Sequence, residues 1–202
     1  MSDSTISTNT VDNMNALERG LKRVGDCIGA VVAMMVLWPV FLAIYIVLKV
    51  DGSSSILFRQ ERIGRDGKPF MLLKFRTMND ETEDVPILAE DNDDRLTPHG
   101  KFLRRHHLDE LPQLWNVLIG EMSFVGYRPE RQYFIEKIME LNPNYSLLYC
   151  SRPGITSYAA VHNGYTYTMK QMLRRLDLDL DYLRHRTLWL DIKILFQTFT
   201  AL

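Results

Sequence analysis

Residues 27–48 read CIGAVVAMMVLWPVFLAIYIVL, a run of 22 residues that contains no charged side chain. A straight helix of this length would be roughly 33 Å long, against about 30 Å for the hydrocarbon core of a bilayer. The run is too long for the core of a cleavable signal peptide and lacks an Ala-x-Ala exit. It also lacks the polar stripe of a helix that packs on a soluble core. We therefore predict that the run enters a membrane.

Pro39 lies near the middle of the run and predicts a bend. Its ring removes the hydrogen bond to the carbonyl of Met35, so each half of the run would reach about halfway across the bilayer. Basic residues flank both ends of the run: Arg19, Lys22, Arg23, Lys49, Arg59, Arg62, Arg65 and Lys68. Since lysine and arginine gather on the cytoplasmic side of a membrane, we predict a re-entrant helical hairpin anchored at Trp38 and Pro39. The alternative is a kinked helix that spans the membrane once.

The sequence around the run divides into further segments. Residues 1–13 are polar and unpatterned, and we predict a disordered tail there. Residues 14–26 are typical of an amphipathic lead-in helix before the re-entrant membrane helix at 27–48. Residues 49–202 are predicted to form a cytosolic domain with interfacial helices. Its last apolar stretch, residues 188–196, fits an interfacial helix and a core-packed terminal helix equally well.

A β-hairpin is predicted where apolar residues 56–58 and 70–73 flank a glycine-containing turn at 64–69. Residues 79–94 carry eight acidic side chains and no basic one, which is typical of a solvated loop or helix face. The predicted fold class is therefore α+β. We expect a mostly helical monotopic membrane protein with a re-entrant hairpin broken at Pro39 and a small β-hairpin.

Cap residues predict the helices of the cytosolic domain. The Thr-Pro pair at 97–98 is a typical helix start. A second helix is expected to begin near Asp109 and to end at Gly120. Further helices are predicted over 133–141 and from Met169 onward.

Composition excludes several classes of function. The 202 residues include 24 Lys and Arg and 25 Asp and Glu, for a formal net charge of −1. A general nucleic-acid binder needs an excess of basic residues to neutralise phosphates, so we expect no nucleic-acid partner. Cys27 and Cys150 lie far apart without a CxxC pair, which argues against a zinc ribbon and a disulfide framework.

The stretch with the most candidate catalytic side chains is centred on Asp109 and Glu110. Alone, such a pair would serve as a helix cap and a first-turn acid. Here Arg104 precedes the pair and Arg128 follows it, so guanidinium groups that match phosphate oxygens bracket two carboxylates. A helix N-terminus favours anions, and Mg²⁺ selects carboxylate oxygens beside phosphates. The pattern predicts phosphoryl chemistry in which a carboxylate attacks phosphorus.

His106 and His107 offer a second interpretation, a hydrolase in which these histidines and the acidic pair bind a transition metal. Neighbouring side chains on a helix point about 100° apart, so the two histidines are poorly placed to share one ion. We therefore favour a surface or interfacial role for them.

Several ordered motifs resemble the bacterial sugar transferases, also called monotopic phosphoglycosyl transferases, over residues 21–195. They are the apolar run with its proline, FRQERIG at 58–64, GKPF at 67–70, KFRTM at 74–78, LDELPQLWNVL at 108–118, MSFVG at 122–126 and RPGIT at 152–156. The resemblance implies transfer of a phosphosugar from a UDP-sugar to polyprenol (undecaprenyl) phosphate with release of UMP. This reaction would be the first membrane step of bacterial glycoconjugate assembly.

The resemblance also implies roles for single residues. Asp109 would attack the sugar-bearing phosphate and form a covalent aspartyl intermediate, and Glu110 with Asp109 would hold Mg²⁺. The residues expected to bind the substrate phosphates and the nucleotide are Arg104, Arg128, Lys74, Arg76 and Arg152. The implied fold is mixed helical and β, with a re-entrant anchor in contact with membrane lipids. We expect the catalytic domain on the cytoplasmic face of the bacterial inner membrane.

Two stretches depart from the family pattern. Its Pro-Arg-Pro element is Tyr127-Arg128-Pro129 here, and the arginine after Asn-Gly in its GWAQVNGR stretch is Tyr165, after an inserted residue near His162. These departures leave a catalytically silent membrane scaffold of the same fold as an alternative. A glycosyltransferase that uses a soluble donor and releases UDP is another. Downstream glycosyltransferases and a second copy of the chain are further partners that the pattern allows.

Overall fold

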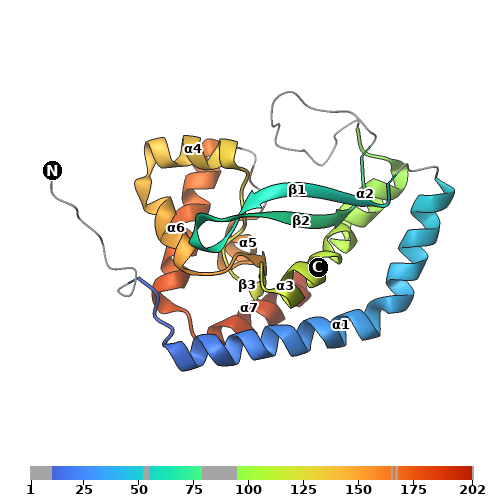
Figure 1. The fold of residues 1–202 in the computed structure, drawn as a ribbon. Coiled ribbons are helices and arrows are strands. Elements are labelled where there is room, and N and C mark those ends of the chain that lie inside the picture. The colour runs from blue at the N-terminus through green and yellow to red at the C-terminus, as the bar shows by residue number, and fades with distance from the viewer. Residues whose placement is uncertain (1–10, 52–54, 79–94, 165, 167, 202) are drawn as a thin grey trace.

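The computed structural model of the chain describes residues 11–51, 55–78, 95–164, 166 and 168–201 (Figure 1). Its helices are α1 (Ala16–Val50), α2 (Pro98–Arg105), α3 (Gln113–Ile119), α4 (Gln132–Leu141), α5 (Tyr158–Asn163), α6 (Met169–His185) and α7 (Leu188–Ala201). Short 3-10 helices are η2 (Arg65–Gly67), η3 (Leu108–Glu110) and η4 (Pro143–Cys150). The strands are β1 (Leu57–Ile63), β2 (Pro69–Phe75), β3 (Ser123–Val125) and β4 (Gly154–Thr156). The predicted α+β class, mostly helical with a small β-hairpin, is confirmed.

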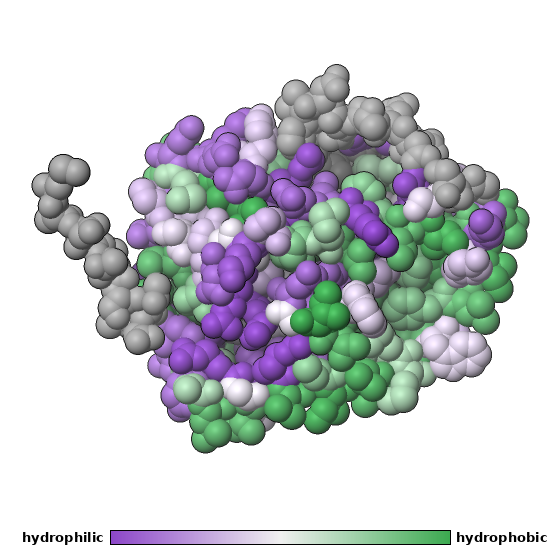
Figure 2. All heavy atoms as spheres, viewed as in Figure 1, coloured by the Kyte–Doolittle hydropathy of each residue, from purple (hydrophilic) through white to green (hydrophobic). Residues whose placement is uncertain are grey.

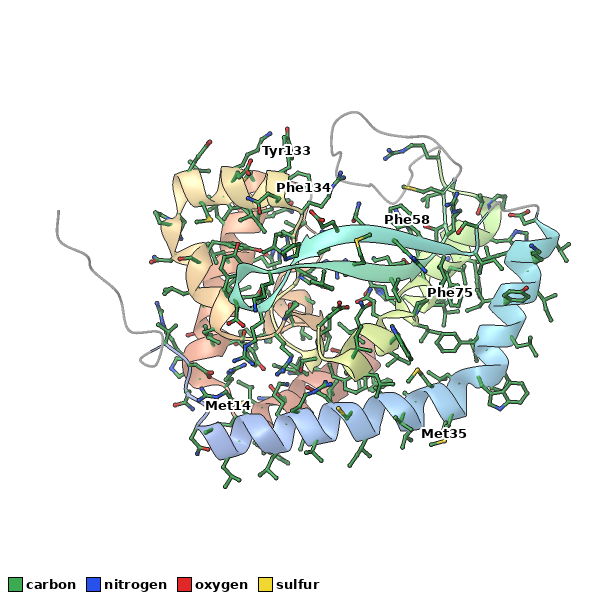
Figure 3. All side chains as sticks on the ribbon, in the orientation of Figure 1. Met14, Met35, Phe58, Phe75, Tyr133 and Phe134 are labelled. Atoms are coloured by element: carbon green, nitrogen blue, oxygen red, sulfur yellow. The ribbon has the colours of Figure 1, made fainter. Side chains whose placement is uncertain are left out.

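α1 is a single helix of 35 residues that contains most of the predicted lead-in segment and the whole apolar run. Asn15 caps its start: the Asn15 side chain accepts from the backbone N–H of Glu18, and the Glu18 side chain accepts from the backbone N–H of Asn15. Pro39 lies inside the helix, where its ring removes a backbone hydrogen bond. The helix bends beyond Met35, which Figure 3 labels on the lower arm. The two arms of α1 therefore follow two sides of the domain (Figure 1).

The first arm of α1 turns its polar side chains toward the domain. Lys22 pairs with Asp191 of α7, and Arg23 donates to the last carbonyls of α3. The buried Asp26 accepts from the backbone N–H of Phe124. The outward side chains are apolar and exposed: Leu17, Leu21, Val24, Ile28 and Met35. This arrangement is the reverse of a soluble amphipathic helix, whose apolar stripe faces the core.

The second arm of α1 packs an apolar face on the domain. Ile44 and Leu48 are buried against Phe75 of β2, labelled in Figure 3, and Leu103 of α2. The outward side of the arm is also apolar, and Figure 2 shows hydrophobic residues gathered along the edges of the molecule where α1 runs. α1 is long and apolar enough to cross a membrane, and only 11% of its most apolar 18-residue window is buried. A core helix of a soluble protein would be mostly buried.

Two small sheets position the loops of the domain. β1 and β2 form an antiparallel hairpin in which Leu57 pairs with Phe75 and Ile63 pairs with Pro69. β3 and β4 are parallel, with Ser123 opposite Gly154. A separate core of buried aromatic and aliphatic residues lies among β1, α4, η4 and α6, on the side where Figure 3 labels Tyr133 and Phe134.

Most predicted element boundaries are confirmed. Thr97 caps α2 through its side chain, and α3 ends at Gly120, whose left-handed backbone (φ 94°) suits glycine. The helices predicted over 133–141 and from Met169 are α4, α6 and α7. α7 buries Ile194, yet it exposes an apolar stripe of Trp189, Ile192, Phe196 and Phe199. This helix therefore packs on the core and also presents an apolar face.

The structure differs from the prediction near the N-terminus. Residues 1–10 lie outside the described residues, but the end of the predicted disordered tail is held in place. Asp12 is buried and pairs with Arg186 and Arg19, and the Asn13 backbone N–H donates to the carbonyl of Leu183. The tail interpretation missed these contacts because Arg186 lies 174 residues away in the sequence.

A second difference concerns the acidic pair. The helix expected to begin near Asp109 begins at Gln113, and Asp109 lies in η3 instead. The acidic run at 79–94, predicted to be a solvated loop or helix face, lies outside the described residues.

Candidate active site

Asp109 and Glu110 occupy η3, the 3-10 turn between α2 and α3. His107 precedes the turn with a left-handed backbone (φ 52°), which few non-glycine residues adopt. The chain therefore leaves the axis of α2 before the acidic pair and brings η3 against β2. Asp109 is only 4% exposed.

Close packing at Gly100 holds α2 beside the end of β2. A Cβ atom at Gly100 would lie 2.0 Å from the carbonyl oxygen of Thr77, so the site accepts only glycine without a shift of the backbone. One turn later, Arg104 Nε donates to Thr77 Oγ1 at 3.2 Å, and Arg104 Nη2 lies 3.7 Å from Met78 Sδ. These contacts hold the Arg104 side chain at the end of α2, where its charge acts on Asp109.

Two cations from different elements meet the acidic pair. Lys74 of β2 places Nζ 2.7 Å from Glu110 Oε1 and 3.8 Å from Asp109 Oδ2. Arg128, in the loop after β3, places Nη2 3.3 Å from the same Glu110 oxygen. The structure therefore brings together four of the predicted site residues, Asp109, Glu110, Lys74 and Arg128.

The two adjacent carboxyl groups differ in their electrostatics. Burial raises the pKa of Asp109, and the attraction of Lys74 only partly offsets that rise. Burial also acts to raise the pKa of Glu110, but Lys74 and Arg128 outweigh it and hold the pKa of Glu110 well below its usual value. The neighbouring Glu110 carboxylate in turn raises the pKa of Arg128. Glu110 is thus the carboxylate that the two cations neutralise directly.

The remaining predicted arginines have other contacts in this structure. The charge of Arg104 acts on Asp109, although its hydrogen bonds go to Thr77 and Met78. Arg152 Nε donates to the carbonyl of Gly120 at 2.8 Å and so caps the end of α3. Arg76 follows β2, extends the hairpin through a backbone hydrogen bond to Ile56, and is half-buried.

The carboxylates offer a donor set that fits Mg²⁺. The contacts from Lys74 and Arg128 converge on one oxygen of Glu110, Oε1. The other Glu110 oxygen and the Asp109 carboxylate are hard oxygen donors, and Mg²⁺ is commonly held by one or two carboxylates together with substrate phosphates. His106 and His107 are both exposed, in agreement with the surface or interfacial role predicted for them.

A family model described as bacterial sugar transferase matches residues 17–202. The chain belongs to the bacterial sugar transferase family. A similar protein is the UDP-glucose:undecaprenyl-phosphate glucose-1-phosphate transferase of Escherichia coli (strain K12), 40% identical over 188 residues, which cover 92% of this chain and 40% of that protein. A protein of the same name from Caulobacter vibrioides is 40% identical over 185 residues, which cover 90% of this chain and 69% of that protein.

A third relative of this bacterial sugar transferase carries the name of another sugar. It is the UDP-N-acetylgalactosamine-undecaprenyl-phosphate N-acetylgalactosaminephosphotransferase of Aeromonas hydrophila, 35% identical over 179 residues, which cover 88% of this chain and 42% of that protein. The chain spans about two fifths of the length of the Escherichia coli and Aeromonas relatives.

Two buried polar residues that were not among the predicted site residues, Asn116 and Glu130, border the site of this sugar transferase. Asn116 of α3 is 1% exposed, accepts from the backbone N–H of Leu73 at 3.1 Å and donates to the carbonyl of Met71 at 2.8 Å. It therefore ties β2, which carries Lys74, to the helix that follows the acidic pair. The sequence feature that could have identified Asn116 is an amide side chain among the apolar residues of a predicted helix. Glu130, the second residue, lies two positions after Arg128 and pairs with Arg62 of β1 and Arg175 of α6.

The second of the two stretches that depart from the family pattern contains the short helix α5. Ser157 caps it by accepting from the backbone N–H of Ala160, and His162 stacks on Tyr158 with 4.1 Å between the ring centres. Tyr165 lies outside the described residues. The acidic pair and its cations are carried by other elements, but the Asp179 carboxylate accepts from the backbone N–H of Ala159 in α5 and from that of Arg128, which links α5 to the loop that carries Arg128.

Proposed function

We propose that this sugar transferase moves a phosphosugar from a UDP-sugar to polyprenol phosphate, releases UMP and passes through a covalent aspartyl intermediate. One observation carries the proposal: a buried acidic pair whose second member binds two cations while the first keeps a raised pKa. The names of the relatives support the substrate classes, a UDP-sugar and undecaprenyl phosphate.

In the first step, an Asp109 carboxylate oxygen attacks the sugar-bearing phosphorus of the UDP-sugar. A bond forms between this oxygen and phosphorus, and the bond between phosphorus and the bridging oxygen breaks. The bridging oxygen leaves with the electron pair as part of UMP. In the second step, a phosphate oxygen of polyprenol phosphate attacks the same phosphorus and expels Asp109, which returns as a carboxylate.

The surrounding side chains explain how the negatively charged diphosphate of the UDP-sugar can approach the Asp109 carboxylate. Lys74 and Arg128 offset the charge of Glu110, and the half-exposed Arg128 guanidinium has further N–H donors for a phosphate oxygen. Arg104, held by Thr77, adds positive charge on the side of α2. Asp109 and Glu110 are the residues that would hold Mg²⁺, which when bound would neutralise charge on the diphosphate.

We further propose that α1 is a re-entrant anchor and not a spanning helix. Its first arm is bound to α3 through Arg23, and its second arm is buried on β2 and α2 through Leu48. Both arms therefore contact one catalytic domain, whereas a spanning helix would carry its ends to opposite faces of the membrane. The apolar outward face of the first arm supports contact with lipid along its length.

The basic flanks of α1 support a position on the cytoplasmic face of the inner membrane. The exposed stripe of α7, formed by Trp189, Ile192, Phe196 and Phe199, supports a second, interfacial contact with lipid. In this placement the lipid substrate keeps its tail in the bilayer while its phosphate reaches Asp109.

A UMP-release assay tests the reaction class and the donor together. The purified protein is mixed with Mg²⁺, polyprenol phosphate and one member of a panel of UDP-sugars that includes UDP-glucose and UDP-N-acetylgalactosamine. We expect UMP with at least one donor and none with Asp109→Asn. Release of UDP would indicate a soluble-donor glycosyltransferase. An absence of both nucleotides across the panel would favour the catalytically silent scaffold that the altered stretch at 157–165 suggests.

A further inference from the structure

Arg128 lies in a loop whose backbone is fixed on both sides. Before it, the carbonyl of Tyr127 accepts from the backbone N–H of Gly154 at 2.8 Å. After it, the carbonyl of Glu130 accepts from the backbone N–H of Ile63 at 3.1 Å. The loop is thus held between β4 and the end of β1.

The side chain of Glu130 is buried beneath this loop. It is 5% exposed and pairs with two arginines from different elements, Arg62 of β1 and Arg175 of α6. Arg62 Nη1 lies 3.4 Å from Glu130 Oε2 and also donates to the carbonyl of Pro129 at 3.0 Å. One turn beyond Arg175, the buried Asp179 accepts a hydrogen bond from the backbone N–H of Arg128. Every residue from 127 to 130 therefore has a hydrogen bond or ion pair to a neighbouring element.

Glu130 is the carboxylate that pairs with both of these arginines. Arg62 approaches the Glu130 carboxylate from β1, and Arg175 approaches it from α6. Both lie close to the loop that carries a third guanidinium, that of Arg128. Without the Glu130 carboxylate, the two half-buried guanidinium groups of Arg62 and Arg175 would repel each other and Arg128, and the loop would shift to separate them. Glu130 itself touches neither Asp109 nor Glu110 through any contact that the described residues show.

We propose that Glu130 is a positioning residue, which binds Arg62 and Arg175 and thereby holds Arg128 against Glu110. Its kinetic consequence rests on the proposed function, but its structural consequence does not. Glu130→Gln keeps the shape of the side chain and removes its charge. In this variant Arg128 is expected to leave the 3.3 Å contact with Glu110.

The structural consequence is measured first, without substrate. Protein labelled with ¹⁵N-arginine is followed by the side-chain Nε–H signals in NMR spectra, and the Arg128 signal is assigned by its loss in Arg128→Lys. We expect this signal to move to the position of solvent-exposed arginines in Glu130→Gln. The matched control is Asp191→Asn, which removes another buried carboxylate, one that pairs with Lys22 and Tyr182. An Arg128 signal that stays in place in Glu130→Gln overturns the proposal.

The kinetic consequence is measured by a double-mutant cycle on UMP release. Glu130→Gln is expected to lower the rate about 10- to 100-fold, as is usual for a residue that orients a catalytic group. In an Arg128→Gln background the same change is expected to cost less than about 2-fold, because the two residues act as one unit. The control Asp191→Asn is expected to have the same effect in both backgrounds. Equal losses from Glu130→Gln in both backgrounds would overturn the positioning role.

The two experiments separate the two proposals. Wild-type protein that releases no UMP contradicts the proposed function, while the NMR result still decides the position of Arg128. If Glu130→Gln unfolds at the temperature of the measurements, Glu130→Asp replaces it, since the shorter side chain cannot reach Arg62 and Arg175 at once and leaves one of them without its counter-charge. The same shift of the Arg128 signal is expected, and an unchanged signal again overturns the proposal.

Discussion

Lys74 Nζ lies 2.7 Å from Glu110 Oε1, and the same nitrogen lies 3.8 Å from the neighbouring Asp109. The two adjacent carboxyl groups therefore have pKa values shifted in opposite directions. Lys74 and Arg128 hold the pKa of Glu110 down, while burial raises that of Asp109. Adjacent acids with different environments commonly take different roles in catalysis. The geometry supports Asp109 as the nucleophile and Glu110 as the residue that organises the cations.

Lys74→Met should weaken both the fold and the reaction. The change leaves the buried Glu110 with Arg128 alone, so we expect a loss of about 2 kcal/mol in the free energy of unfolding. UMP release should fall about 100-fold or more, because a charge beside the reacting phosphate is lost. Lys68→Met, in the exposed turn of the hairpin, is the control and should stay within about 0.5 kcal/mol of the wild type. Wild-type rates in Lys74→Met would contradict the role of Lys74.

Gly100→Ala should destabilise the protein through a single methyl group. That group would lie 2.0 Å from the carbonyl oxygen of Thr77, so α2 must move away from β2. We expect a loss of about 2 kcal/mol, measured by chemical denaturation in detergent. Gly20→Ala is the control, since a Cβ atom there meets no atom within 4 Å. That variant should be neutral or slightly stabilised, because alanine favours helix over glycine.

Asp179 should make stability fall as pH rises. Burial raises its pKa to about 7 from the usual 3.8, so the folded state binds a proton that the unfolded state releases between these values. Wild-type stability should therefore decrease from about pH 4 to pH 7 relative to Asp179→Asn, and the difference should level off above pH 7. Melting temperatures of the two proteins across this range test the slope. Asp177→Asn, exposed on the same helix, should show a difference from wild type that does not vary in this way.

Cysteine labelling tests the re-entrant topology. Single cysteines are introduced as Ala16→Cys and Ser55→Cys, on either side of the apolar run, after replacement of Cys27 and Cys150. An impermeant maleimide should label neither position in intact cells and both positions in inverted membrane vesicles. Labelling of one position alone in intact cells would establish a spanning helix instead.

The sequence predicted the elements whose signals are local. The cap at Thr97, the stop at Gly120 and the hairpin turn at 64–69 each depend on a few neighbouring residues, and all three are confirmed. The turn that holds Asp109 was not predicted, because it depends on a left-handed backbone at His107, where the residue type carries little signal.

Side-chain partners far apart in the sequence were harder to predict. The motif stretches contained Lys74 and Arg128, but their meeting at one oxygen of Glu110 requires β2 and the loop after β3 to come together. Arg152, which is predicted to bind the phosphates, donates from Nε to the carbonyl of Gly120 at the end of α3, a contact that the sequence did not predict. The positive charge of a residue does not by itself show whether it meets the acidic pair or caps a helix, because either contact depends on tertiary packing.

The most direct test of the proposed reaction is a search for the covalent intermediate proposed at Asp109. The purified protein is incubated with its UDP-sugar and Mg²⁺ in the absence of polyprenol phosphate, then analysed by intact mass and peptide mapping. We expect one phosphosugar on the peptide that contains Asp109, a matching burst of UMP, and loss of the adduct when polyprenol phosphate is added. An adduct on another residue, or a full UMP burst from Asp109→Asn, would contradict the proposed reaction.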